Sequence, residues 1–348
     1  MRFRANVIAL AAGLLVAACG GAASTAPNPG ASKAPMTPAT IKVSLPGLKP
    51  AFSQSDIAVA EAGGFFREQQ LTVQTQGLAS GVKTVQSVVA GDSDIGASSI
   101  EPVLGAAAQG SLEIIGSYAD RLPVVMETPS AIASPADLRG KQLGIQDVGA
   151  FREVMTRFVY QGAGLKQDDV KYVSVADTGY VSALLTHKID SAILQQEQSV
   201  DAEARDPGLH ALADLSKTLP DYFYGTYFVK SDWLQAHRDV AVRFLTAITK
   251  AHRLIYSDRA KVVPEIAGAT GFSADVIGRA YDRLITKDGV FAVNEGLEAK
   301  RLTATMARMK DVGLLPNGSP DLSRVVDRGP IHEAVQSLGA MKGDPRWH

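Results

Sequence analysis

The feature of this sequence that most constrains its fold is a repeated alternation of short strand-like runs with amphipathic helical runs. Between residues 41 and 194, brief apolar or alternating stretches are separated by segments whose apolar residues recur at helical spacing. Such alternation is typical of parallel strands joined by helices, with the helices covering the faces of the sheet. We therefore predict an α/β protein built on mixed, mostly parallel sheets.

The alternation falls into two blocks, and each block has enough strands for a sheet. Strand-like runs lie at 41–45, 71–76, 94–97 and 112–117 in the first block, and at 142–146, 170–175 and 191–194 in the second. After an aromatic run at 222–229 the chain becomes helical, and a helical tail needs an existing sheet to pack on. We expect lobe 1 to comprise 41–121 plus 227–348, and lobe 2 to be an insertion, 122–226, joined by two hinge crossings.

One short segment indicates how a unit of the second block begins. Ser134 precedes Pro135, Asp137 lies in the following turn, and Gly140 stands just before the strand-like run 142–146. Serine is favoured at a helix N-cap, proline at the first helical position and glycine just after the helix end. The pattern predicts a capped helical turn that leads into a buried strand.

The first 40 residues have the character of a leader and a linker. Arg2 and Arg4 precede an apolar run, 7–18, which is short for a membrane span but suits a secretory signal. Small residues then lead into Cys19, as in a lipobox; an ordinary signal peptide with a chance cysteine is the alternative. We predict a lipoprotein signal peptide over 1–18, a lipid on Cys19, and a flexible tether over 19–40 that is too poor in large apolar residues to fold.

Charge and cysteine content narrow the possible functions. The 35 basic and 36 acidic residues give a formal net charge of −1 without a dense basic block, so nucleic-acid binding has no electrostatic basis. The only cysteine is Cys19, which leaves the folded body no thiol for a disulfide, a zinc site or a nucleophile. The six histidines lack metal-ligand spacing, and no catalytic motif is complete. We expect no catalytic residue, no metal and no cofactor.

A ligand site is expected where the strands end, because open parallel sheets bind ligands outside the carboxyl ends of their strands. Helix N-termini at that edge offer unpaired N–H groups and partial positive charge. The predicted ligand-binding residues follow the strands of both blocks or precede the return crossing: Ser53, Gln54, Ser80, Gly81, Ser98, Ser99, Gly149, Ala150, Phe151, Tyr180, Gln195 and Tyr224.

Each of these candidates also has a purely structural interpretation. Ser53, Ser80 and Ser99 suit simple helix N-capping better than direct ligand contact, because serine is preferred at that position for backbone reasons. The aromatic candidates, together with Tyr222, Phe223 and Tyr227, are as well suited to the core or the hinge as to the cleft. Arg152 and Arg121 suit either an anionic ligand or a surface salt bridge.

Several separate sequence segments, considered together with their order along the chain, resemble one known group of proteins. They are residues 61–71, 89–96, 134–146, 183–192 and 234–240. Together they resemble the solute-binding proteins of ABC importers, in the group that serves nitrate, aliphatic sulfonates, taurine and thiamine precursors. Two departures are Arg238, where the group often has proline, and the unusually polar run Gln195-Gln196-Glu197-Gln198. The resemblance implies a two-lobed periplasmic-binding-protein-like fold.

The resemblance also implies a function and a location. It implies a monomer outside the cytoplasm, held at a membrane by its lipid, that closes about its hinge on a small solute and delivers it to a permease and its ATPase. Two alternatives stay open: an enzyme like the thiamine-pyrimidine synthases of the same superfamily, whose cysteine-rich motif this chain lacks, and a sensor or interaction subunit of the envelope. A neighbouring pair of permease and ATPase genes would favour the importer.

Overall fold

The computed structural model describes residues 36–108, 110–315, 318–344 and 347. Contacts divide the chain into two units, Met1–Met36 and Thr37–His348, and all that follows concerns the second. The predicted signal peptide, Cys19 and most of the predicted tether lie outside the described residues. Within the ranges given, no helix combines the length and the apolar character that crossing a bilayer requires.

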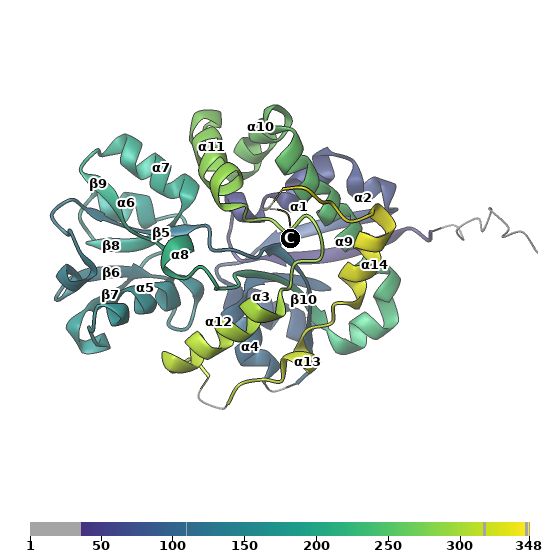
Figure 1. Cartoon of the computed structure of the whole chain (residues 1–348), viewed down its shortest axis with the longest axis horizontal. Coiled ribbons are helices and arrows are strands. Elements are labelled where there is room, and N and C mark those ends of the chain that lie inside the picture. The colour runs from purple at the N-terminus through teal and green to yellow at the C-terminus, as the bar shows by residue number, and fades with distance from the viewer. Residues whose placement is uncertain (1–35, 109, 316–317, 345–346, 348) are drawn as a thin grey trace, which may run out of the picture. The chain divides into compact units, whose positions relative to one another are not determined.

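The strands of this unit form two five-stranded sheets. They are β1 (Ala39–Leu45), β2 (Leu71–Gly77), β3 (Ile95–Ser99), β4 (Leu112–Ala119), β5 (Val124–Pro129), β6 (Gln142–Ile145), β7 (Lys171–Ser174), β8 (Ser191–Gln195), β9 (Leu209–Asp214) and β10 (Gly225–Lys230). Sheet A has the order β2-β1-β3-β10-β4, and sheet B has the order β7-β6-β8-β5-β9 (Figure 1).

Both sheets are mixed but mostly parallel, which confirms the predicted fold class. In sheet A, β1 runs parallel to β2 and β3, and β10 runs against both of its neighbours. In sheet B, β6 runs parallel to β7 and β8, and β5 runs against β8 and β9. Each sheet therefore has one reversed strand, and the chain passes between the sheets at residues 120–123 and 215–224.

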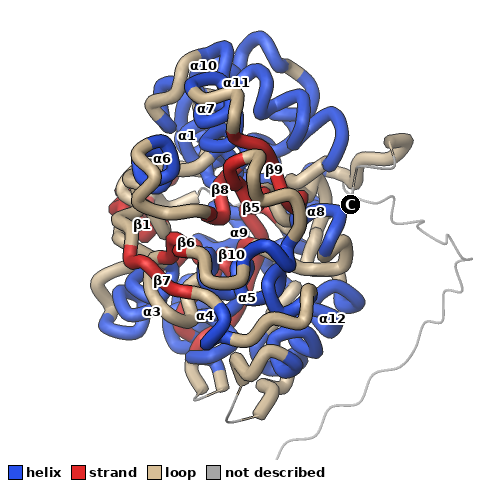
Figure 2. Tube along the Cα trace, turned by 90° about the vertical axis from the view of Figure 1, so that its left-hand side faces the viewer, coloured by secondary structure: helices blue, strands red, loops and turns tan. Residues whose placement is uncertain are grey.

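Helices connect the strands and surround the sheets, as Figure 2 shows from a second direction. The α-helices are α1 (Asp56–Ala62), α2 (Phe65–Glu68), α3 (Gly81–Ala90), α4 (Ile100–Ala107), α5 (Phe151–Gly162), α6 (Tyr180–Leu185), α7 (Gln196–Arg205), α8 (Leu215–Thr218), α9 (Ser231–Ser257), α10 (Arg259–Thr270), α11 (Ala274–Tyr281), α12 (Ala299–Asp311), α13 (Leu322–Val325) and α14 (Gly329–Leu338). Short 3-10 helices are η1 (Phe52–Gln54), η2 (Pro135–Leu138) and η3 (Gln167–Asp169), and a π-helix, η4, spans Asp282–Asp288.

The predicted capped turn before β6 is present as the 3-10 helix η2. Ser134 is its N-cap, and the Asp137 carboxylate accepts hydrogen bonds from the Ser134 backbone N–H at 2.8 Å and from its hydroxyl at 2.9 Å. Gly140 follows with a φ of +77°, a conformation that glycine adopts without steric cost. The chain then enters β6, whose last three residues are buried.

Two strands and one helix contact differ from the sequence-based expectation. Strands β5 and β9 were not predicted: β5 directly follows the first chain crossing, and β9 is rich in alanine, which is depleted in strands. The helical tail was expected to pack on the first block alone. It does pack there through α9 and α14, but α11 also packs on α7 of the second block. Figure 1 shows α11 and α7 side by side.

Candidate functional site

A cavity of about 320 Å³ lies where the strand ends of sheet A face those of sheet B. Its lining includes Gln54 after β1, Gly81 after β2 and Ser99 at the end of β3. The sheet B half contributes Gln146 after β6 and Asp177 after β7. Residues in the first turn of α7 also line the cavity. The cavity therefore occupies the edge at which open parallel sheets bind ligands.

The structure brings half of the predicted ligand-binding residues onto the cavity wall. These residues are Gln54, Gly81, Ser99, Phe151, Gln195 and Tyr224. The other six are not part of the lining: Ser53, Ser80, Ser98, Gly149, Ala150 and Tyr180. Among these, Tyr180 is fully buried and its ring lies under the Arg152 guanidinium, whose central carbon is 4.1 Å from the ring centroid.

The N-cap position is confirmed for two of the three candidate serines, but neither of them makes the expected capping hydrogen bond. They are Ser80 and Ser99, the N-cap residues of α3 and α4. Ser53 lies inside η1, and Ser55 is the N-cap residue of α1. The hydroxyls of Ser53, Ser80 and Ser98 are buried and have no hydrogen-bond partner in the described part of the chain.

Arg152 is a buried cation of the cavity wall rather than a member of a surface salt bridge. Its side chain donates from Nη1 to the Ile193 carbonyl oxygen and from Nη2 to Gln198 Oε1 at 3.1 Å. Only 5% of the residue is exposed. Arg121, the other candidate arginine, does not line the cavity and donates to the carbonyl oxygen of Asp288 at 2.8 Å.

Besides Asp201, which pairs with Arg205, two carboxylates that were not among the predicted site residues line the cavity. Glu197, in the first turn of α7, accepts a hydrogen bond at Oε1 from the Phe52 backbone N–H at 3.1 Å. Asp177 accepts from the Leu48 N–H at 3.3 Å and from Gln146 Nε2 at 3.2 Å. Burial raises the pKa of both carboxyl groups above the ordinary range. The only sequence signal for Glu197 was the unusually polar run that follows β8.

Rings supply the apolar part of the wall. The centroids of Phe151 and Tyr224 are 4.6 Å apart, and Tyr118 meets Tyr224 edge-on at 5.5 Å. The neighbouring aromatic candidates point elsewhere: the Tyr222 hydroxyl donates to Glu101 at 2.6 Å, and Tyr227 donates to Asp56 at 2.8 Å. Phe223 is fully buried and does not line the cavity.

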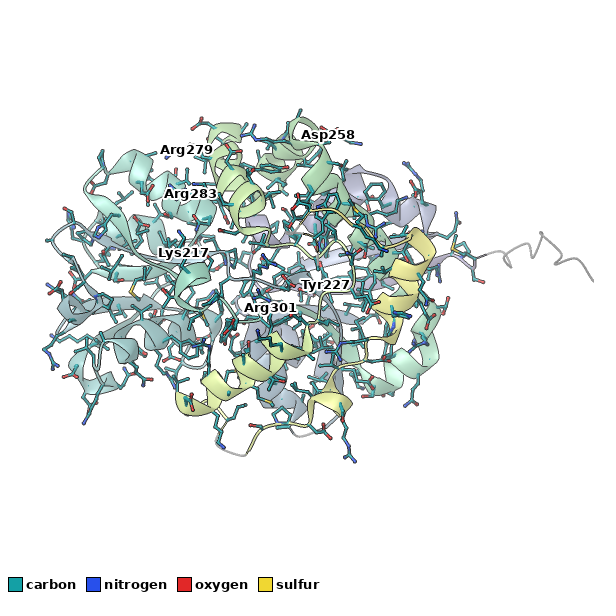
Figure 3. The ribbon with its side chains drawn as sticks, viewed as in Figure 1. Lys217, Tyr227, Asp258, Arg279, Arg283 and Arg301 are labelled. Carbon is teal, nitrogen blue, oxygen red and sulfur yellow. The ribbon has the colours of Figure 1, made fainter. Side chains whose placement is uncertain are left out.

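The helical tail closes one side of the cavity. Thr270, the last residue of α10, and the next two residues, Gly271 and Phe272, are part of the lining. Further along the tail, Arg283 of the π-helix donates to Gln196 Oε1 at 3.3 Å and to Glu203 Oε2 at 3.1 Å, and both partners are on α7. Figure 3 shows Arg283 on the tail segment that faces α7. Contacts between the tail and α7 thus add to the two chain crossings.

The cavity has the chemistry of a binding site for a small organic molecule. It combines flat apolar rings with a few fixed polar groups from separate elements, which is the usual make-up of ligand pockets. Within the described ranges, no group of three or more histidine, cysteine or acidic side chains is placed to hold a metal ion.

Two α/β halves with a ligand-sized cavity between their strand ends define the two-lobed, periplasmic-binding-protein-like class of folds. Within this class, the chain belongs to the NMT1/THI5-like family, whose family model matches residues 52–261, more than half of the sequence. The suspected family is thereby confirmed.

Known proteins that resemble the chain agree with this class. A relative from Brucella abortus (strain 2308), which carries the provisional name of a binding protein, is 28% identical over 196 residues. That match covers 55% of this chain and 59% of the relative, less than two thirds of the relative's length.

Solved structures show the same fold at low sequence identity. The alkanesulfonate-binding protein SsuA from Xanthomonas axonopodis pv. citri, bound to MOPS, has a TM-score of 0.70 and 18% identity over 84% of this chain and 99% of that chain. The nitrate-binding protein NrtA from Synechocystis PCC 6803 has a TM-score of 0.71 and 12% identity over 87% and 89% of the two chains.

Proposed function

We propose that this protein is the solute-binding subunit of an ABC importer and that it captures one small solute in the cavity between sheets A and B. The observation that carries the proposal is the lining itself, because Gln54, Gly81 and Ser99 come from the sheet A half and Phe151 and Gln195 from the sheet B half. A ligand that contacts both halves favours the closed state over the open one. The closed form is then the form that a permease and its ATPase receive.

We further propose a location and a state for the protein. It is an extracytoplasmic lipoprotein, cleaved before Cys19 and anchored by lipid on that residue, with residues 19–40 as the tether. It works as a monomer and carries out no covalent chemistry. The names of its relatives support binding, and the lack of any cysteine after position 19 argues against a cysteine-dependent enzyme on this fold.

Filling the cavity is expected to abolish solute binding. Val181 on α6 lines the cavity and is only partly buried, so a tryptophan at this position would occupy part of the 320 Å³ without entering the core. A thermal-shift screen of anions, sulfonates, pyrimidines, amines and aromatic acids identifies the solute, because a ligand of the native state raises the melting temperature. We expect Val181→Trp to weaken binding of that solute, measured by calorimetry, at least about tenfold.

Val89→Trp is the matched control for this experiment. Val89 is also a helical valine, on α3, but it is 51% exposed and does not line the cavity. Its replacement should leave the affinity unchanged. Full affinity in the Val181→Trp variant, or a screen in which no compound raises the melting temperature of the wild-type protein, would argue against solute capture in this cavity.

A further inference from the structure

The cavity wall carries two buried hydrogen-bond acceptors that have no donor. Gln195 uses Nε2 to donate to the Tyr224 hydroxyl at 3.2 Å, and its Oε1 has no partner among the described residues. Glu197 uses Oε1 to accept from Phe52, and its Oε2 likewise has no partner there. The two residues are only 6% and 1% exposed. Buried acceptors without donors are costly, and a ligand that donates to them removes that cost.

The charges of the wall balance, and two of its three cations already have partners. Arg152 is the buried cation of the lining, and its guanidinium already donates to Ile193 and Gln198. Three carboxylates, Asp177, Glu197 and Asp201, line the same cavity. Two exposed cations, Lys49 and Arg205, line it as well, and Arg205 is paired with Asp201 at 3.3 Å. Nitrate and sulfonate have only acceptor oxygens. Next to the free oxygens of Gln195 and Glu197, which are also acceptors, they would form no hydrogen bond and would be repelled.

The rings beside these acceptors specify the rest of the ligand. Phe151 and Tyr224 provide flat contact area next to Gln195, and flat faces stack well on planar, delocalised groups. Cations are attracted to the faces of aromatic rings as well.

From these observations we infer that the cavity selects a planar solute carrying a cationic or neutral N–H donor group, such as an amidinium or an aryl amine, over nitrate, sulfonate or carboxylate. The inference rests on the proposed function, and it makes Glu197 the residue that determines specificity. A bound cation also favours the ionised form of a buried carboxyl group.

The geometry of Glu197 allows a substitution that reverses the preference. Because the Phe52 N–H holds one oxygen of the side chain, a glutamine at this position would keep its carbonyl oxygen on Phe52 and turn its NH₂ toward the cavity. Glu197→Gln thus replaces the free acceptor with a donor at nearly constant shape. Glu265→Gln is the matched control, because it makes the same change at an exposed position of α10 that does not line the cavity.

The test compares benzamidine with benzoate and benzenesulfonate at millimolar concentration, by calorimetry and thermal shift. We expect the wild-type protein to bind benzamidine at least about tenfold more tightly than either anion, and Glu197→Gln to lose at least about tenfold in benzamidine affinity. Glu265→Gln should change that affinity by less than about threefold, because exposed charges far from the ligand are screened by solvent. Unchanged melting temperatures of both variants without ligand would show that they fold.

Three results would overturn the inference. They are tighter binding of an anion by the wild-type protein, full benzamidine affinity in a folded Glu197→Gln variant, and no binding of benzamidine at all. None of these three results contradicts the proposed function if the thermal-shift screen identifies another solute and Val181→Trp blocks the binding of that solute. A screen without any ligand would instead count against the proposed function.

Discussion

Replacing Asp56 with alanine is expected to lower the free energy of unfolding by about 3–5 kcal/mol. Asp56 is fully buried, and its Oδ2 accepts from the Tyr227 hydroxyl at 2.8 Å and lies 3.1 Å from His252 Nε2. His252 Nδ1 in turn contacts the Ala292 carbonyl oxygen at 2.7 Å, so both ring nitrogens face acceptors. Removing the carboxylate leaves buried polar groups of His252 and Tyr227 without their partner.

This hydrogen-bonded network joins α1 and β10, two elements that lie next to residues of the cavity wall. Asp56 begins α1, directly after the turn that presents Gln54 to the cavity, and Tyr227 lies in β10. Asp282→Ala is the control, because Asp282 pairs with Arg259 at the same distance, 3.1 Å, while 58% of its side chain is exposed. Denaturant unfolding should show less than about 1 kcal/mol of loss for this exposed pair. Equal losses in the two variants would contradict the role given to the buried network.

Replacing Glu127 with glutamine is expected to stabilise the protein at pH 8 by up to about 3 kcal/mol. Glu127 is fully buried on β5, and both carboxylate oxygens lack a hydrogen-bond partner in the part of the chain that is described. Burial raises its pKa from 4.5 to about 7, and the nearby Glu203 adds to the rise. The positive charge of Arg283 offsets the rise only in part.

The pH dependence follows from the direction of this pKa change. The folded protein holds the Glu127 proton more tightly than the unfolded chain does, so this stabilisation is complete below about pH 4.5 and is lost as the pH rises through about 7. Denaturant unfolding between pH 5 and pH 8 should show this loss in the wild-type protein and a flatter profile in Glu127→Gln. Glu265→Gln, at an exposed position of α10, should keep the wild-type profile. A destabilised Glu127→Gln protein at pH 8 would contradict the account.

The sequence predicted the location of the cavity better than its individual contacts. Alternating strand and helix patterns locate the strand ends, and those ends do face the cavity. They do not show which of two neighbouring residues reaches it. Successive side chains of a strand point to opposite faces, so Ser98 and Ser99 at the end of β3 cannot both line the wall, and Ser99 does. Gln54 lines the cavity while its neighbour Ser53 does not.

The contributions of the tail could not be predicted, because they depend on contacts between distant parts of the chain. Nothing in the local pattern around Phe272 shows that the segment after α10 closes the cavity. The contact of Arg283 with Glu203 joins residues that are 80 positions apart. Glu197 was noted only as part of a polar run, and its role became visible when Phe52 was found against it.

The central claim is that one solute bridges the two halves and draws them together. Small-angle X-ray scattering tests it most directly, with the solute from the screen at saturating concentration. We predict a smaller radius of gyration for the wild-type protein with solute than without it, and no change for Val181→Trp at the same concentration. An unchanged radius of gyration in wild-type protein that calorimetry shows to be saturated would contradict closure on the solute.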